Sequence, residues 1–395
     1  MKNGFFARIS LVCLPFLLIF VAGSNTSINK AFVNQAPSTE KTVIKKSDKS
    51  LQGPIEYVLE KLQVYDLVMI GERHWTHEEP VFIQNLIRSC FEKNAINVVF
   101  LEFGNFEDQG KIDVFMTTPE YDPTPVIDAL RNSYEFGWGY QEYFDIFKLI
   151  YEENRKRPPS EKMKLVLTDG PPDDIYVEKE LYKCIENSQM QEKQKWSIVS
   201  WLGEAITDRD LFMAEVINVY LFKPKLKGIY YAGAAHIRKD LRQKNYGRRL
   251  FSAGGILYRK YPGRVCCMTL HSRPENWQDP NDFQKMEKIF IEHGNPFAID
   301  TKNPKIANLR LKSDIKEQGV SLQEAFDGYI MLNQDKDYQP CTFILGFYDD
   351  EFAKVVWDRL RKNGLLKRFP PELQKWKHKP WTGEELMELM KQGLH

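Results

Sequence analysis

Six short apolar runs alternate along the chain with longer segments in which apolar residues recur at helical spacing. Near-continuous apolar runs are typical of strands buried on both faces, as in a parallel sheet that carries helices on each side. The pattern therefore predicts a doubly wound α/β fold. The expected strands lie at 66–71, 96–101, 164–168, 228–233, 264–270 and 328–332.

Helices are expected between these strands, because the intervening segments place apolar residues three or four positions apart. A charged helical tail follows the last strand, and Thr382 and Glu385 form a capping box that introduces its final helix. The other expected helices lie at 54–62, 80–93, 143–155, 174–188, 190–222, 237–260 and 280–293.

Residues 104–141 are the exception to this alternation, since several prolines make them a long irregular excursion. Such an insertion beside a sheet edge builds a lid or substrate wall, or else a satellite core. Its aromatic residues are Tyr134, Phe136, Trp138 and Tyr140.

The first residues have the pattern of a secretory signal peptide, expected at 1–24. Lys2 and Arg8 accompany an apolar run at 9–21, and small residues follow it. This run of about 13 residues is shorter than the roughly 20 that span a bilayer, and an uncleaved anchor is the alternative. Residues 25–50 are expected to be a flexible spacer. We therefore expect export to the periplasm or the extracellular space, with no stable membrane span after signal cleavage.

The composition fits one sizeable domain at 51–395. Of the 395 residues, 43% are hydrophobic and 28% charged, so the chain can bury a substantial core. A formal net charge of +1 without a basic stripe argues against nucleic-acid binding. The cysteines show neither a disulfide framework nor zinc-ligand spacing. Cys266 and Cys267 lie within one expected strand and should face opposite sides of the sheet as core residues.

Acidic or imidazole side chains follow five of the expected strands. The carboxyl ends of parallel strands meet at one edge of a sheet, and ligands bind in the crevice beyond that edge. The sequence therefore predicts a polar, titratable site there, either catalytic or metal-binding. The side chains are those of Glu72 with His74, Glu102, Asp169, His236 and His271.

The motif Gly71-Glu72-Arg73-His74 is the sharpest of these candidates. A carboxylate beside an imidazole fixes the tautomer of the ring and raises its basicity, as a general base requires. The same pair is also suited to ligate a metal. The alternative is a surface loop in which Glu72 pairs with Arg73. His77 is a weaker candidate that also suits the start of the next helix.

Glu102 is expected beside the end of the first strand, within reach of His74. Asp169 opens an Asp-Gly-Pro sequence, which also suits a plain turn. His236 follows small residues that allow close approach, whereas His271 precedes an ordinary loop.

Arg209 lies between Asp208 and Asp210 at the expected start of a helix. Acids at this position offset the helix dipole, but a cation is disfavoured there unless it has an anionic partner. We expect that partner to be a substrate oxyanion or a carboxylate of the site.

Together, four of these motifs resemble the erythromycin esterase/ChaN-like superfamily in order and spacing over about residues 60–335. The resemblance implies a three-layer α/β/α sandwich with a mainly parallel sheet and a cleft at its carboxyl edge. It also implies a histidine base acting on water, with the roles carried by His74, Glu72, Glu102, His236 and Arg209. Only one residue separates Glu72 from His74, which is closer to the ChaN-like branch of haem-associated lipoproteins.

These observations predict an exported hydrolase that acts on an ester, lactone or amide of a small-molecule substrate. Arg73, Asp169 and Asp210 are expected to contact this substrate. One alternative is a haem- or iron-binding protein with His74, His77 or Tyr134 as ligands. Another is a divalent-metal site, as in the distantly related TIKI-type metalloproteases, built from His74, Glu72 and His236.

Overall fold

The computed structural model describes residues 50–133, 136–170, 209–245, 248–313, 316–362, 364–369, 376 and 378–391. Asp48–His395 form one compact unit. The predicted signal peptide, the spacer up to residue 49, the helix at 174–188, Asp208 and Tyr134 lie outside the described residues, as does the first part of the helix expected at 190–222. Across the described part of the chain, no helix combines the length and apolarity needed to cross a membrane.

A central sheet dominates the fold. In the described residues it has seven strands in the order β3-β2-β4-β1-β7-β11-β8, and all neighbouring pairs are parallel except β11 with β8. The mainly parallel sheet is therefore confirmed. The strands are β1 (Leu67–Glu72), β2 (Val98–Asn105), β3 (Lys164–Asp169), β4 (Gly228–Gly233), β7 (Val265–Leu270), β8 (Phe297–Asp300) and β11 (Gly328–Met331).

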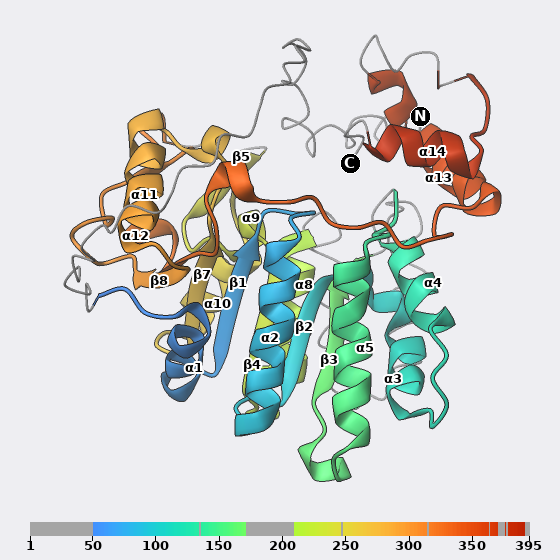
Figure 1. The fold of residues 1–395 in the computed structure, drawn as a ribbon, viewed down its shortest axis with the longest axis horizontal. Coiled ribbons are helices and arrows are strands. Elements are labelled where there is room, and N and C mark those ends of the chain that lie inside the picture. The colour runs from blue at the N-terminus through green and yellow to red at the C-terminus, as the bar shows by residue number, and fades with distance from the viewer. Residues whose placement is uncertain are drawn as a thin grey trace, which may run out of the picture. The chain divides into compact units, whose positions relative to one another are not determined.

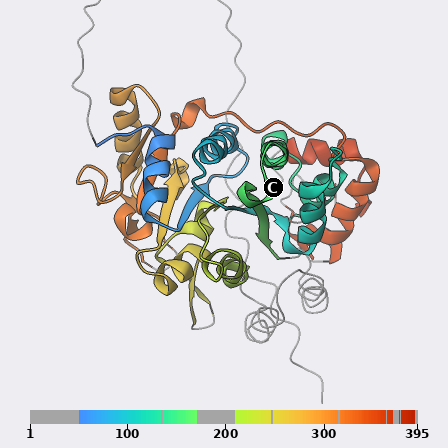
Figure 2. The ribbon, with the colours of Figure 1, turned by 90° about the horizontal axis from the view of Figure 1, so that it is seen from below.

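Helices cover both faces of this sheet, as Figures 1 and 2 show from two directions. The larger helices of the described residues are α1 (Pro54–Val64), α2 (Glu78–Lys93), α3 (Gln109–Thr117), α4 (Thr124–Asn132), α5 (Gln141–Arg155), α8 (Arg209–Ile217), α10 (Ala253–Lys260), α11 (Pro280–His293), α13 (Asp350–Lys362) and α14 (Gly383–Lys391). Of these, α13 and α14 lie beyond the sheet and not over a face of it (Figure 1). The short α9 (Ala234–Ile237) and α12 (Leu322–Ala325) complete the set used below.

The core is split by the sheet into two clusters, because successive strand residues point to opposite faces. Val68 and Ile70 of β1 pack with α1, α2 and α5, whereas Leu67 and Met69 pack with α8 and α10. Cys266 joins the first cluster and Cys267 the second, as predicted. The result is the three-layer α/β/α sandwich that the motifs implied.

The helix expected at 237–260 was wrong as a single element. After the one-turn α9, the chain forms a hairpin of β5 (Leu241–Asn245) and β6 (Arg248–Phe251), and only then α10. The physical reason lies at Ser252, whose side chain accepts a hydrogen bond from the backbone N–H of Gly255 and so begins a new helix.

Two further sequence expectations require correction. The excursion at 104–141 is not irregular throughout, since it contains α3 and α4. The antiparallel edge strand β8 and a small hairpin of β9 (Arg310–Leu311) and β10 (Val320–Ser321) were not predicted. Both are too short for periodicity to reveal them.

The strand neighbours also differ from expectation at one important place. Glu102 was expected beside the end of β1, but β4 lies between β2 and β1. Along the edge, the strands follow one another in the order β3, β2, β4, β1, β7. Asp169, Gly233 and Glu72 end their strands, Glu102 lies within β2, which runs on to Asn105, and His271 follows β7.

Candidate functional site

The carboxyl edge of the sheet brings Glu72 and His74 into direct contact. Nδ1 of His74 lies 2.6 Å from Oε1 of Glu72. The Glu72 side chain is 1% exposed and that of His74 is 29% exposed, so the imidazole lies between the buried carboxylate and solvent. The ion pair with Arg73, the alternative for this loop, is not formed with Glu72.

Aromatic rings surround the imidazole of His74. The ring centroid of Trp138 lies 5.0 Å away in an edge-on arrangement, and that of Trp75 lies 5.5 Å away. Phe103 stacks on Trp138 from the other side. The predicted aromatic segment thus serves as core and as a wall of the site at once, with Trp138 and Tyr140 both buried.

Glu102 lies next to this pair, although its strand is not adjacent to β1. Its Oε2 accepts a 2.6 Å hydrogen bond from the backbone N–H of Gly233, the last residue of β4. A register shift in β2 between Leu101 and Asn105, with Gly104 at a φ of 124°, marks a bulge around Glu102. Bulges of this kind re-aim side chains next to functional sites.

Gly233 lies between Glu102 and His74 and is close to both side chains. A Cβ atom at position 233 would lie 2.7 Å from Cε1 and Nε2 of His74 and 3.4 Å from Oε2 of Glu102. The Cε1–Nε2 edge of the imidazole therefore packs against the glycine, on the side where Glu102 lies. Any larger residue would displace the ring.

Arg209 lies at the start of α8 and binds carboxylates of two strands. Its Nε lies 2.6 Å from Oδ1 of Asp169, and its Nη2 lies 2.6 Å from Oδ2 of the same residue. Nη2 also lies 2.8 Å from Oε1 of Glu102. This is a bidentate pair, the strong form of an arginine–carboxylate contact. The anionic partners expected for Arg209 are thus two carboxylates at the edge of the sheet.

His236 on α9 contacts carboxylates at both ring nitrogens. Nδ1 lies 2.6 Å from Oδ1 of Asp210, and Nε2 lies 3.2 Å from Oε1 of Glu102. Burial acts to lower the pKa of His236, but Asp210 and then Glu102 outweigh it and raise the pKa to about 9. His236 is therefore an imidazolium at neutral pH.

Glu102 is correspondingly ionised. Burial favours its neutral form, but His236 and Arg209 overcome this effect and hold its pKa well below the usual value. Asp169, Arg209, Glu102, His236 and Asp210 thus form one charged network beside the Glu72–His74 pair, in which all members but Arg209 are buried.

Two expected site residues point elsewhere. Nη1 of Arg73 lies 2.5 Å from Oδ1 of Asp335, and its guanidinium stacks over the ring of Tyr338. His271 is fully buried between the hydroxyl of Tyr329 and the carboxylate of Glu287. Burial lowers the pKa of His271, so we expect a neutral ring there.

The residues expected as haem or metal ligands are arranged as follows. His77 is 45% exposed in its side chain, and its Nδ1 lies 2.7 Å from Oε1 of Glu142. His74 and His236 each use ring nitrogens on carboxylates. In the part of the chain that the structure describes, no three His, Cys, Asp or Glu residues are grouped as a metal site.

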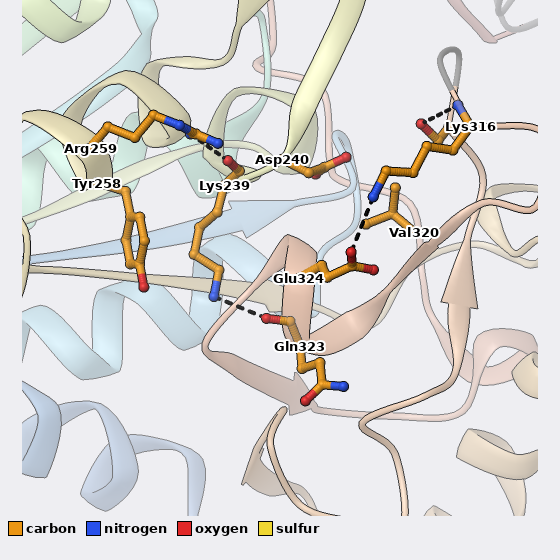
Figure 3. A pocket seen from close by; sticks show the side chains of 9 residues that line it. Lys239, Asp240, Tyr258, Arg259, Lys316, Val320, Gln323 and Glu324 are labelled. Carbon is orange, nitrogen blue, oxygen red and sulfur yellow. Dashed lines mark hydrogen bonds and ion pairs between the residues drawn. The ribbon is translucent and has the colours of Figure 1, made fainter.

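A surface hollow of about 430 Å³ lies apart from this network and is lined by none of its residues. Its cations bind protein groups, as Figure 3 shows: Lys239 donates to the backbone oxygen of Gln323, and Lys316 pairs with Glu324. Lys239 is paired with Asp327 as well.

Three residues of the site were missed in the sequence. Tyr143 on α5 bonds to Glu72, Gly233 separates His74 from Glu102, and the fully buried Glu79 accepts the backbone N–H of Arg73. Burial raises the pKa of Glu79 well above its usual value. Among these, only Gly233 had a signal in the sequence, since it lies in the run of small residues before His236.

No protein-family model and no curated protein matches the chain in sequence. Similar solved structures include a succinoglycan biosynthesis protein at 11% identity and TM-score 0.51, and a Bacillus cereus protein at 14% and 0.50. A mutant of the erythromycin esterase EreC, in its open conformation, is similar at 14% sequence identity and a TM-score of 0.46.

Each of these similarities covers 73% of this chain, and they cover 91%, 93% and 94% of the respective neighbours. Identities of this size show a shared fold and leave the activity open. The chain therefore shares its α/β fold with the succinoglycan biosynthesis protein and the Bacillus cereus protein.

Proposed function

We propose that this protein activates water to hydrolyse an ester, lactone or amide, with His74 as the general base. The observation that carries the proposal is the Glu72–His74 pair, in which Glu72 holds Nδ1 while the Nε2 edge faces Gly233 and Glu102. A carboxylate at Nδ1 orients the imidazole and stabilises its protonated form.

In the proposed step, water bound between Nε2 of His74 and Oε2 of Glu102 gives a proton to Nε2. Its oxygen forms a bond to the carbonyl carbon of the substrate, and the carbonyl electrons move to the oxygen as an oxyanion. When the tetrahedral species collapses, the leaving group takes the proton back from His74.

The neighbouring cations suit the stabilisation of that oxyanion. The buried His236, whose ring nitrogens both contact carboxylates, contributes its positive charge at neutral pH without donating to the substrate. Arg209 can approach the oxyanion, because its side chain is 37% exposed. A well-placed donor of this kind typically contributes about 3–4 kcal/mol to an acyl-transfer transition state. Glu102 contacts both cations, Asp169 holds Arg209, and Asp210 holds His236. Asp169 and Asp210 therefore act through these cations and need not contact the substrate.

Hydrolysis of a panel of esters, lactones and amides tests this proposal. The full chain is compared with His74→Ala and with His293→Ala, which removes a histidine from the end of α11. We expect turnover of at least one ester or lactone that falls about 10²–10⁴-fold in His74→Ala and is unchanged in His293→Ala. Equal turnover in all three proteins contradicts the assignment.

Haem binding is the alternative outcome. An absorbance change on adding haem that disappears in a His74 or His77 variant, together with a silent panel, supports a binding protein without catalysis. The exposed His77 with its carboxylate partner Glu142 is the better-placed ligand of the two.

A further inference from the structure

The hydroxyl of Tyr143 contacts Glu72, the carboxylate of the Glu72–His74 pair. Tyr143 is fully buried on α5, and its hydroxyl lies 2.8 Å from Oε2 of Glu72. The backbone N–H of Trp75 donates to the same hydroxyl at 3.1 Å. One buried phenol thus contacts the residue that holds His74 and the residue that follows it.

The direction of each proton in this chain of contacts is fixed. A backbone N–H can only donate, so the Tyr143 oxygen accepts from Trp75 and its own proton points to Glu72. Burial, and then the Glu72 carboxylate, raise the pKa of Tyr143 well above 10, so the phenol keeps that proton.

These hydrogen bonds determine which ring nitrogen of His74 carries the hydrogen. Oε2 of Glu72 is occupied by the Tyr143 proton, and Oε1 faces Nδ1 of His74 at 2.6 Å. With both oxygens of Glu72 accepting hydrogen bonds, Nδ1 carries the ring hydrogen. In the neutral ring, Nε2 is then left with a lone pair on the edge that faces Gly233 and Glu102.

The same hydroxyl stabilises an unusual backbone turn. Trp75 has a φ of 66°, in the left-handed region that aromatic residues rarely adopt. The Tyr143 hydroxyl accepts the backbone N–H of Trp75, and the backbone N–H of Cys341 donates to the carbonyl oxygen of Trp75 at 2.9 Å. Strained residues of this type persist where the surroundings hold them in place, often at functional sites.

The geometry points to Tyr143 as a positioning residue that fixes the Nδ1–H tautomer of His74, and thereby the nitrogen that accepts a proton from water. The role in catalysis rests on the proposed hydrolase function. The tautomer itself does not, since it follows from contacts within the protein.

Nuclear magnetic resonance of the full chain labelled with ¹³C,¹⁵N-histidine tests this inference without any substrate. The ¹³Cδ2 and ring ¹⁵N shifts of neutral His74, assigned with His74→Ala, report which nitrogen carries the hydrogen. In the wild type we expect the Nδ1–H tautomer to predominate.

In Tyr143→Phe, Oε2 of Glu72 loses the donor that fixes the orientation of its carboxyl group. The contact between Oε1 and Nδ1 then no longer selects one tautomer of His74. We therefore expect the population of the Nε2–H tautomer to rise about tenfold, the factor that corresponds to one lost hydrogen bond.

Tyr151→Phe is the matched control, because it removes a buried hydroxyl from the same helix whose acceptor is the backbone oxygen of Thr118. It should leave the His74 signals unchanged. The inference is overturned if Tyr143→Phe folds with the wild-type tautomer. Should Tyr143→Phe fail to fold, an Nε2–H tautomer in the wild type overturns it equally. A panel without turnover combined with the expected tautomers would refute the hydrolase function and leave the role of Tyr143 intact.

Discussion

The Cε1–Nε2 edge of His74 packs against Gly233 so closely that a Cβ atom on this residue would lie 2.7 Å from both ring atoms. The same glycine donates its backbone N–H to Glu102 at 2.6 Å. The end of β4 therefore sets the separation between the proposed base and the carboxylate that faces it.

The methyl group added by Gly233→Ala should push the imidazole ring of His74 away from Glu102. Because a misplacement of about 1 Å can cost roughly 10²-fold in rate, we expect kcat to fall by about that factor. Gly110→Ala on α3, where a Cβ meets no atom within 4 Å, serves as the control. Hydrolysis rates of the two variants measure the difference, and a fully active Gly233→Ala would show that this spacing is unimportant.

The pH dependence of activity should depend on Asp210. Because Asp210 is the strongest influence that raises the pKa of His236, we expect activity to fall as pH rises through about 9, where His236 loses its charge. In Asp210→Asn this alkaline limb should move to lower pH. Profiles of kcat/KM against pH for both proteins provide the measurement, and identical limbs would exclude His236 as their origin.

The charge of His236 should also contribute to stability. Its pKa of about 9 in the folded state exceeds the ordinary value of 6.5, so the folded protein binds this proton more tightly. The contribution, on the order of 3 kcal/mol, is complete below a pH of about 6.5 and declines as pH rises towards 9.

Denaturant titrations of the wild type and His236→Gln at a series of pH values measure this contribution. The difference in the free energy of unfolding between the two proteins should shrink as pH rises from 6 to 9.5. A difference that grows with pH would contradict the proposed charge state.

Glu102→Gln should weaken the charged network of Asp169, Arg209, Glu102, His236 and Asp210. The amide oxygen can still accept the N–H of Gly233, but Arg209 and His236 lose a carboxylate in a buried setting. We expect a loss of about 1–3 kcal/mol in the free energy of unfolding, together with reduced turnover. The exposed Glu120→Gln is the control for both measurements, and should match the wild type.

The strands and the edge of the site were predictable because the sheet is buried on both faces, so that each strand is a nearly unbroken apolar run. Glu72, Glu102, Asp169 and His236 interrupt or follow these runs, and the structure brings them together. The order of the strands was not accessible in this way, which is why Glu102 was expected next to β1.

The residues that were missed act through tertiary contacts. Tyr143 lies 71 positions from Glu72, on a helix whose apolar face masks its role. The partners of Arg209 belong to β2 and β3, and periodicity within α8 carries no information about them. The helix predicted at 237–260 is interrupted by the hairpin after α9, because the cap at Ser252 begins a separate helix there.

Chemical rescue of His74→Ala tests the central claim most directly. The variant removes the proposed base and leaves a space beside Trp75, Trp138 and Gly233 into which imidazole can diffuse. We expect added imidazole to restore part of the lost ester hydrolysis, increasingly as pH rises and more of the imidazole is neutral, with no effect on His293→Ala. Turnover in His74→Ala that equals the wild type without imidazole would contradict a proton-accepting role for His74.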